Sequence, residues 1–424
     1  MNPTTAAAVP LPLTREARLV PLAKGEPGVS RRGIPTKKGL ILMFNILTLN
    51  KISPFGLEKF DKEKYTCGEA VADPAAVMVR SASMFDTEIP ASVLAIARAG
   101  AGTNNIPIDI CTEKGICVFN TPGANANAVK ELVLCALLVS SRKVPEALDW
   151  CKTLKGEGAQ VGKLVEKGKS AFTGQEVSGK TLGVIGLGAI GILVANTALA
   201  LGMDVISYDP FLSVNNALSV DPKVKVVGNI DEVFAVSDYI TLHTPLNDST
   251  RDLINAKSIA LMKNGVRILN FARGELVNSA DIIEALESDK AAAYATDFPT
   301  DEQICSKGVI AIPHLGASTP ESEDNCAVMA ANQLIAYLER GEIVNSVNLP
   351  YMQLPMTFAN RVCVIHRDIE GAQANIAAAL AGCQIASLTS SAKKGWAYTV
   401  ADIIGTADIE KIEKVNGVVK ARIL

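Results

Sequence analysis

Short apolar runs alternate with stretches of helical periodicity between about residues 43 and 345. The runs predict strands at 44–49, 75–80, 182–185, 204–208, 238–243, 266–271, 291–297 and 309–312, and the periodicity predicts helices at 91–99, 125–141, 255–263, 279–288 and 320–340. Asn125 and Gly341 are placed to cap two of these helices. Residues 151–178, rich in Gly and Lys, are predicted to connect two units. Because strands that alternate with helices form parallel sheets, the pattern predicts an α/β fold with a doubly wound sheet.

The pattern changes at both ends of the chain. From Arg361 to Leu424 the order is strand, helix, strand, strand, helix, strand, which is typical of one ferredoxin-like module. Residues 1–42 contain scattered prolines and basic residues without sustained periodicity, and we expect them to be flexible. Their basic residues would permit an organellar targeting segment, but Glu16, Glu26 and the lack of an amphipathic run favour a cytoplasmic protein.

The composition excludes several classes of protein. Of the 424 residues 48% are hydrophobic, which excludes bulk disorder. The 41 Lys and Arg residues nearly balance the 44 Asp and Glu residues, so nucleic acid is not an expected partner. The nine cysteines include no C-x-x-C pair and the chain has only three histidines, so no metal site is predicted. The cysteines are instead interpreted as free thiols in a reducing compartment. Residues 181–203 carry no charge, but five glycines there indicate a strand that enters a helix, so no membrane partner is expected either.

A glycine-rich turn predicts a dinucleotide site. Gly186, Gly188 and Gly191 follow a predicted strand and open a predicted helix in the order G-x-G-x-x-G. This arrangement lets the backbone approach a pyrophosphate at the helix N-terminus. Asp209 closes the next predicted strand, where a carboxylate can accept hydrogen bonds from ribose hydroxyls and repels a 2′-phosphate. The expected cofactor is therefore NAD rather than NADP.

Three further polar groups follow later strands of the same unit: Arg273, Glu302 and His314. Because ligands bind outside the carboxyl ends of parallel strands, we expect these groups to lie in the same crevice as the cofactor. Oxidation of a 2-hydroxy acid needs a cation for the carboxylate and a base for the hydroxyl proton, which Arg273 and His314 can supply. Glu302 is the expected carboxylate partner of the imidazole, with Asp301 as the alternative.

Several motifs together carry a family resemblance. They are Val79–Ser81, Arg98–Asn105, Asn120–Asn125, Gly179–Gly188, Ala272–Gly274 and Pro313–Gly316. With them the chain resembles the D-2-hydroxyacid dehydrogenases over roughly residues 43–424. The resemblance implies a Rossmann-type NAD-binding domain (144–316) inserted in a flavodoxin-like substrate-binding domain (43–143 and 317–345), and a homodimer or homotetramer.

The resemblance also implies roles for individual residues. Arg273, Glu302 and His314 correspond to the catalytic Arg, Glu and His of the family, and Asp297 lies where the family has an aspartate that contacts the nicotinamide amide. The implied cofactor contacts are Gly186, Gly188, Ala189, Ile190, Gly191, Asp209, Thr244, Pro245, Ala272, Arg273, Asp297, His314 and Gly316. The implied substrate contacts are Arg80, Ser81, Ala101, Gly102, Asn125, Arg273 and His314. His243 is interpreted as structural.

The C-terminal module, residues 352–424, resembles the ACT domain that senses amino acids in biosynthetic enzymes. His366, Asp368 and Gln384 are the candidate effector contacts. Glu370, Asp368 and Gln384 depart from the family pattern, which predicts weak or absent inhibition by L-serine. The module favours the members of the family that oxidise 3-phosphoglycerate to 3-phosphohydroxypyruvate, towards L-serine. Two alternatives stay open at this point: a dehydrogenase for an unphosphorylated 2-hydroxy acid, and a non-catalytic NAD-sensing scaffold.

Overall fold

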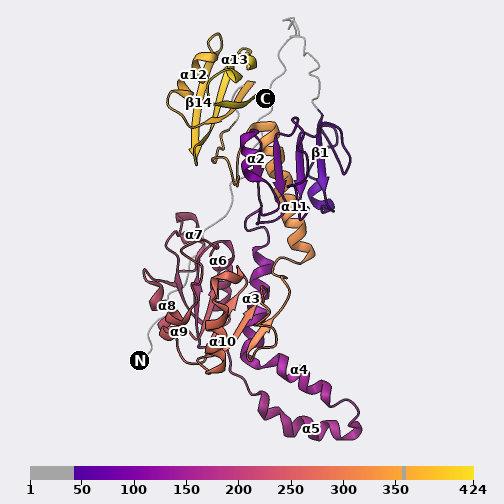
Figure 1. The fold of residues 1–424 in the computed structure, drawn as a ribbon, viewed down its shortest axis with the longest axis vertical. Helices are drawn as coiled ribbons and strands as arrows, with labels where there is room; N and C mark the ends of the chain where they lie inside the picture. The colour runs from indigo at the N-terminus through magenta and orange to yellow at the C-terminus, as the bar shows by residue number, and fades with distance from the viewer. Residues whose placement is uncertain (1–42, 356–359) are drawn as a thin grey trace, which may run out of the picture. The chain divides into compact units, whose positions relative to one another are not determined.

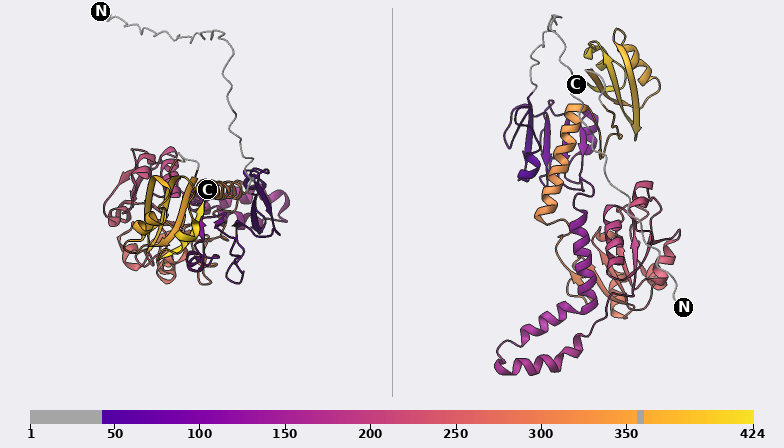
Figure 2. Two further views of the ribbon diagram at one scale, coloured as in Figure 1. Left: turned by 90° about the horizontal axis from the view of Figure 1, so that it is seen from above. Right: turned by 180° about the vertical axis from the view of Figure 1, so that it is seen from behind.

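The computed structural model describes residues 43–355 and 360–424, so the predicted N-terminal extension lies outside the described residues. The first sheet is parallel, with the order β2-β1-β3-β4-β5. Its strands are β1 (Phe44–Leu49), β2 (Tyr65–Gly68), β3 (Ala76–Val79), β4 (Ala95–Arg98) and β5 (Cys117–Phe119), and the helices joined to it are α1 (Pro54–Leu57), α2 (Ile108–Glu113) and α11 (Pro320–Arg340). Helix α11 lies against the strands in both views (Figures 1 and 2) and shares one hydrophobic core with them. This strand order is the flavodoxin-like one, as expected.

The helix predicted at residues 91–99 is wrong, because Ala95–Arg98 form strand β4. This strand pairs with β3 on one side and with β5 on the other. Ala95, Ile96 and Ala97 are fully buried, so both faces of the strand are apolar. A short apolar run that is buried on both faces cannot be distinguished from a buried helical segment by periodicity alone.

The second sheet is also parallel, with the order β12-β11-β10-β9-β6-β7-β8. Its strands are β6 (Thr181–Ile185), β7 (Asp204–Tyr208), β8 (Lys225–Val226), β9 (Tyr239–Leu242), β10 (Val266–Asn270), β11 (Ala291–Thr296) and β12 (Val309–Ala311). The helices of this unit are α3 (Ala126–Arg142), α6 (Ala189–Ala200), α7 (Val214–Ser219), α8 (Ile230–Val236), α9 (Ala256–Leu261) and α10 (Ser279–Glu287). The strand order reverses next to β6, so the carboxyl ends of β6 and β9 form the switch point at which such sheets bind ligands.

The predicted connection at residues 151–178 is largely helical. Helices α4 (Val144–Thr153) and α5 (Val161–Gly168), with two short 3-10 turns at Gly158–Gln160 and Lys169–Phe172, follow α3 and extend away from it (Figure 1). Neither helix contains a buried residue. Glycine and lysine in this stretch therefore mark an exposed helical arm rather than an irregular linker. The side chain of Asn125, predicted as a cap, makes no capping hydrogen bond to α3.

The C-terminal module has the predicted ferredoxin-like order. Strands β13 (Asn360–Arg367), β14 (Gln384–Lys393), β15 (Trp396–Ile404) and β16 (Val418–Ile423) form an antiparallel sheet with the order β14-β15-β13-β16, and the helices are α12 (Ala372–Ala379) and α13 (Ile409–Glu413). One face of this sheet packs into the same hydrophobic core as the first sheet and α11, through residues such as Cys363, Tyr398 and Val400.

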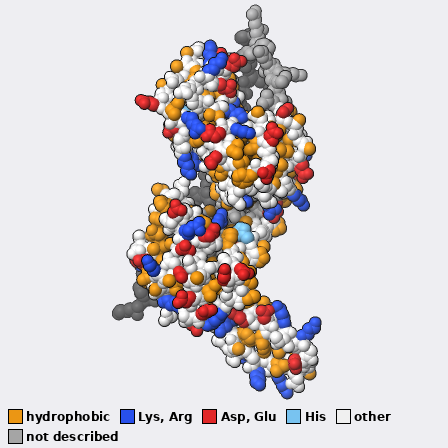
Figure 3. All heavy atoms as spheres, viewed as in Figure 1, with side chains coloured by type: hydrophobic (Ala, Val, Ile, Leu, Met, Phe, Trp, Pro, Cys, Tyr) orange, Lys and Arg blue, Asp and Glu red, His pale blue; other side chains and the backbone are white. Residues whose placement is uncertain are grey.

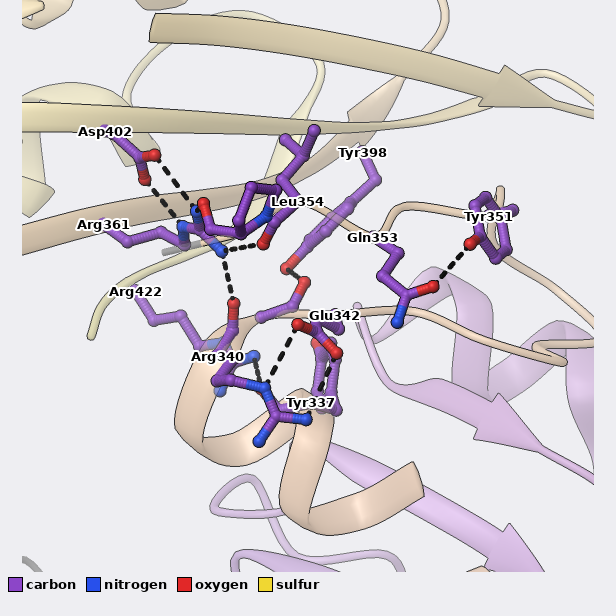
Figure 4. A network of polar contacts seen from close by, with 12 residues as sticks. Tyr337, Arg340, Glu342, Tyr351, Gln353, Leu354, Arg361, Tyr398, Asp402 and Arg422 are labelled. Carbon is purple, nitrogen blue, oxygen red and sulfur yellow. Dashed lines mark hydrogen bonds and ion pairs between the residues drawn. The ribbon is translucent and has the colours of Figure 1, made fainter. Parts of the chain in front are cut away.

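Polar side chains of the module hold the C-terminal end of α11 (Figure 4). The carbonyls of Tyr337, Arg340 and Gly341 accept hydrogen bonds from Arg422 (2.5 Å), Arg361 (2.9 Å) and Tyr398 (2.9 Å), respectively. Tyr337 and Arg340 belong to the last turn of the helix, and Gly341 is the left-handed residue that ends it. Carbonyls at the end of a helix cannot all find hydrogen-bond donors within the helix itself. The sheet of the module therefore completes the hydrogen bonding of a helix that belongs to another part of the fold.

Candidate active site

A cleft of about 1740 Å³ is lined by the loops of both parallel sheets. The predicted residues that line it are Arg80, Ser81, Ala101, Gly102, Asn125, Gly188, Ala189, Ile190, Thr244, Pro245, Ala272, Arg273, His314 and Gly316. All the predicted substrate contacts are therefore on one cleft, together with most of the predicted cofactor contacts. Gly186, Gly191, Asp209, Asp297 and Glu302 do not line it.

The glycine turn between β6 and α6 has the shape that a dinucleotide requires. Gly186 has a φ of +97°, and a side chain there would meet the backbone of His243 at 2.6 Å. A Cβ on Gly191 would lie 1.9 Å from the carbonyl oxygen of Gly186, so the helix can approach the turn this closely only without a side chain. At Gly188, by contrast, no atom lies within 4 Å of the Cβ position. The backbone at Gly188 is thus open to a ligand at the helix N-terminus.

Asp209 follows β7, beside the glycine turn. Its Oδ2 accepts from the backbone N–H of Leu187 at 2.8 Å, and its Oδ1 accepts from that of Phe211 at 2.8 Å. These bonds fix the carboxylate next to the turn. Each oxygen can accept a further hydrogen bond, so the position fits the ribose of NAD.

Among the predicted cofactor contacts, two buried polar atoms beside the cleft have no partner in the described residues. They are the Oδ1 of Asp297, a side chain only 1% exposed, and the Oγ1 of Thr244. Buried polar atoms are normally hydrogen-bonded, and an orphaned atom calls for an absent ligand or water. Both residues were predicted to contact the cofactor, so the residues present fit NAD.

Arg273 and His314 come together around an aromatic ring. The ring of Phe298 lies 4.3 Å from that of His314, between centroids, and the guanidinium carbon of Arg273 lies 6.0 Å from the centroid of Phe298. The buried Asn270 donates to the carbonyl of Arg273 at 2.8 Å and so fixes the loop after β10. The His314 side chain is 59% exposed, which leaves its outer nitrogen accessible from the cleft.

The carboxylate bonded to His314 is Asp297, not Glu302 or Asp301. Asp297 Oδ2 lies 3.0 Å from His314 Nδ1, whereas Glu302 and Asp301 are exposed on the loop that follows. Hydrogen bonds to its own backbone and to Thr300 lower the pKa of Glu302. The structure therefore brings neither of the two predicted carboxylates, Glu302 and Asp301, to the imidazole.

At the substrate end of the cleft, Arg80 forms a short ion pair with Glu323 of α11. Ser81 and Asn125 also line this region, with the backbone of Ala101 and Gly102. Both members of the ion pair are 41% exposed, so the guanidinium is accessible to a second anion. The side chain of Asn120 donates to the carbonyl of Ala101 at 2.6 Å and fixes this loop.

Sequence reasoning missed Arg98 as a site residue, although the motif that begins with it was recognised. Its guanidinium lies against Gly100, where a Cβ would approach Nη1 to 2.2 Å. Burial lowers the pKa of Arg98, and the positive charges of Arg80 and Arg273 add to this effect. Its buried Nε has no partner in the described part of the chain. Three arginines, Arg80, Arg98 and Arg273, therefore line the cleft. The only sequence signal for Arg98 was its place at the start of the motif Arg98–Asn105.

His243 also lines the cleft, but it fits the structural role expected for it. Its Nε2 lies 2.9 Å from the hydroxyl of Thr241, and burial lowers the pKa of His243 to about 4. The ring is therefore neutral near pH 7.

A smaller pocket of about 330 Å³ lies on the C-terminal module. His366, Asp368 and Ser390 line it. The ring of His366 is held by Thr399, whose hydroxyl lies 2.8 Å from Nε2, and Thr399 donates in turn to Ser390 at 2.8 Å. Gln384, the third predicted effector contact, begins strand β14 and does not line this pocket. Two of the three candidate residues are thus brought together.

The described surface adds two observations. Acidic and basic side chains are interspersed over the face in Figure 3, and neither sign gathers into one large patch. Within residues 43–355 and 360–424, no helix is long and apolar enough to cross a membrane.

Comparisons with known proteins agree with this geometry. Residues 134–317 match the family described as D-isomer specific 2-hydroxyacid dehydrogenase, NAD binding domain. The chain is 33% identical over 328 residues to the D-3-phosphoglycerate dehydrogenase of Bacillus subtilis, covering 73% of this chain and 60% of that protein. It is 38% identical over 292 residues to the enzyme of that name from Methanocaldococcus jannaschii, covering 66% and 53%. The chain thus spans between half and two thirds of the length of these relatives.

Solved structures are also similar. The NAD+-bound 3-phosphoglycerate dehydrogenase of Entamoeba histolytica superposes with a TM-score of 0.55 and 25% identity, covering 73% of this chain and all of that chain. A glyoxylate reductase from Paecilomyes thermophila superposes with a TM-score of 0.56 and 26% identity, covering 72% and 98%.

Proposed function

We propose that this chain, whose residues 134–317 match the NAD-binding domain of the D-isomer specific 2-hydroxyacid dehydrogenases, oxidises D-3-phosphoglycerate to 3-phosphohydroxypyruvate with NAD. The observation that carries the proposal is the set of residues that line one cleft. Arg80, Arg98 and Arg273 line it together with His314 and the glycine turn at Gly188. The relatives named D-3-phosphoglycerate dehydrogenase support the same substrate.

The three arginines suit a substrate with a carboxylate at one end and a phosphate at the other. Arg273 is next to His314, so it would hold the carboxylate and the developing carbonyl oxygen near the base. Arg80 would bind the phosphate through its guanidinium, whose geometry matches that of a phosphate, and Ser81 would bind it through its hydroxyl. Burial and the positive charges of Arg80 and Arg273 both disfavour the charged form of Arg98. An anion bound beside Arg98 would stabilise its positive charge.

The chain's own residues then account for proton transfer and orientation. His314 would take the proton of the substrate hydroxyl at Nε2, because Nδ1 is engaged by a carboxylate. Bound NAD supplies the acceptor for the hydride that leaves C2. The Phe298 ring packs beside the imidazole and narrows the space open to water around it.

A second candidate is oxidation of an unphosphorylated 2-hydroxy acid. The Arg80–Glu323 ion pair favours it, since Arg80 already has an anionic partner. The similarity to a glyoxylate reductase points the same way. A non-catalytic NAD-sensing scaffold is disfavoured, because Arg273 and His314 lie together on the cleft.

The deciding experiment is an NADH-oxidation assay on phosphohydroxypyruvate beside hydroxypyruvate, pyruvate and glyoxylate. We expect the highest kcat/KM with phosphohydroxypyruvate, because only this substrate engages Arg80 and Ser81 with a phosphate. Arg80→Ala is the control variant. Equal kcat/KM for phosphohydroxypyruvate and hydroxypyruvate would favour the second candidate, and NADH binding without any turnover would favour the scaffold.

We also propose that the chain self-associates through the C-terminal module and acts in the cytoplasm. Strand β14 forms an edge of its sheet and is mostly exposed, so its outer N–H and C=O groups are open to a second copy. All nine cysteines are free thiols, as expected in a reducing compartment. Light scattering coupled to gel filtration tests the first proposal: a monomer at micromolar concentration would contradict it.

A further inference from the structure

Glu323 is the carboxylate that pairs with Arg80 at the substrate end of the cleft. It lies in the first turn of α11 and lines the cleft, whereas Glu321, in the same turn, is exposed and does not line it. Of the three arginines that line the cleft, Arg80 alone forms an ion pair with a carboxylate among the described residues. The cleft therefore contains an anion of its own beside the group proposed to bind the phosphate.

The backbone on the Arg80 side of this ion pair is fixed. Asn50 Oδ1 accepts hydrogen bonds from the backbone N–H groups of Ser81 (3.1 Å) and Ala82 (2.6 Å). Asn105 Nδ2 donates to the carbonyl of Ala82 at 2.8 Å. Because these bonds hold the loop after β3, Arg80 changes its partner through rotation of its own side chain and not through movement of the loop.

The start of α11 is fixed as well. The hydroxyl of Ser53, which caps α1, donates to the carboxylate of Asp324 at 2.5 Å. A Cβ on Gly56 of α1 would lie 2.6 Å from the Cβ of Ala327, so the two helices are in close contact. The backbone that carries Glu323 is therefore held against α1. The ion pair opens through rotation of its two side chains, each 41% exposed.

A substrate with an anion at its far end has to take Arg80 away from Glu323. A carboxylate and a phosphate use the same N–H donors of a guanidinium, so the two anions compete for one set of donors. A bound phosphate would also lie beside the carboxylate that it displaces, and like charges repel. A 2-hydroxy acid without a terminal anion displaces nothing, because its carboxylate is assigned to Arg273 and the ion pair can stay closed.

We infer that Glu323 is a specificity-determining residue of the proposed reaction, and that it lowers the preference of the cleft for acids with a terminal anion over acids without one. This role rests on the proposed function, which assigns the phosphate to Arg80. Glu323 acts on binding of the terminal anion and not on hydride or proton transfer, which take place at the other end of the substrate. Partly exposed ion pairs are weak, so the expected effect on affinity is about three- to tenfold.

The experiment compares Glu323→Gln with the matched control Glu321→Gln in the full chain. Both variants remove one negative charge from the first turn of α11, so they change the interaction with the helix dipole alike, but only Glu323 pairs with Arg80. The kinetic readouts are kcat and KM for phosphohydroxypyruvate and hydroxypyruvate. Calorimetry gives the Kd of 3-phosphoglycerate and of D-glycerate for the NADH-bound chain, in which no hydride transfer can occur.

We expect Glu323→Gln to lower KM for phosphohydroxypyruvate and Kd for 3-phosphoglycerate by about threefold or more, with kcat and the constants of the unphosphorylated acids within about twofold. Glu321→Gln should change none of these values by more than about twofold. Unchanged or weaker binding of 3-phosphoglycerate by Glu323→Gln would overturn the inference, and so would an equal gain for D-glycerate. If the parent chain turns over hydroxypyruvate as well as phosphohydroxypyruvate, the proposed function fails. The calorimetric Kd values then still decide the role of Glu323, because they need no turnover.

Discussion

Two arginines of the C-terminal module form ion pairs that should differ sharply in their contribution to stability, one with Asp402 of the module and one with Glu113 of α2. Arg361 and Asp402 are 1% and 3% exposed and are joined by two contacts, of 2.6 and 3.0 Å (Figure 4). The remaining donors of Arg361 go to the carbonyls of Arg340, Leu354 and Pro355. Asp402→Asn leaves a buried guanidinium without a counter-charge, and breaking such a pair costs about 3–5 kcal/mol of unfolding free energy.

The matched control is Glu113→Gln. Glu113 accepts two contacts of 2.5 Å from Arg367, but these side chains are 58% and 44% exposed. Water solvates both partners when the pair is broken, so the expected cost is about 1 kcal/mol or less. The two variants change the same kind of group by the same single charge. Burial is the variable that the comparison isolates.

Equilibrium urea unfolding is the assay. Trp396 stacks against Arg367, with 3.9 Å from the guanidinium carbon to the ring centroid, so its fluorescence reports on the module. Trp150 on the helical arm is removed by Trp150→Phe in every sample. With a slope of about 3 kcal/mol per molar urea, Asp402→Asn should lower the midpoint by about 1–2 M. A shift below 0.3 M (roughly 1 kcal/mol at that slope), or a larger shift for Glu113→Gln, would refute the argument from burial.

Three further predictions follow from the cleft and the glycine turn. Burial holds the pKa of His243 at about 4, below its unfolded value of about 6.5, so unfolding takes up a proton between these pH values. Stability should fall by up to roughly 3 kcal/mol as the pH drops from 6.5 to 4, and His243→Asn should flatten this part of a denaturation series; an unchanged slope would contradict the reasoning. Asp209→Ala should raise the ratio of NADPH to NADH efficiency at least tenfold, because it removes the ribose acceptor and the repulsion of a 2′-phosphate; equal use of both cofactors by the parent chain would contradict this. Arg80→Ala should raise KM for phosphohydroxypyruvate at least tenfold but leave KM for hydroxypyruvate within about twofold, since the lost contact is made to the phosphate; equal losses would place the phosphate elsewhere.

Much of the fold follows from local sequence signals. The strand at Asp204–Tyr208 was predicted with these bounds and the helix at Pro320–Arg340 with approximately these bounds, because flanking turns and caps mark their ends. The strand at Ala95–Arg98 was not, since burial on both faces removes the alternation that identifies a strand. The exposed arm was predicted only as a connection, because its glycines and lysines resemble those of a linker and neither of its helices buries a residue in the fold.

The site was predictable in the same uneven way. Gly186, Gly188 and Gly191 were identified because their order along the chain is itself the physical requirement. The partner of His314 was not, because whether Asp297 or Glu302 reaches the ring depends on where the intervening loop is tied, and Gln303 and Ser279 decide that through a tertiary contact. Likewise no local signal marks Arg361 and Asp402 as a buried pair, since they lie 41 positions apart.

The attachment of the C-terminal module to α11 bears on how such a chain can change in evolution. The arginines at 361 and 422 and the tyrosine at 398 satisfy the carbonyls at the end of that helix, where the negative end of its dipole favours positive charge. A descendant that lost the module would expose these carbonyls and the apolar face beside them at the same moment. Loss by a single truncation is therefore disfavoured, and gain of the module by fusion would require matching changes at the end of α11. The module and that helix end should vary together among related sequences.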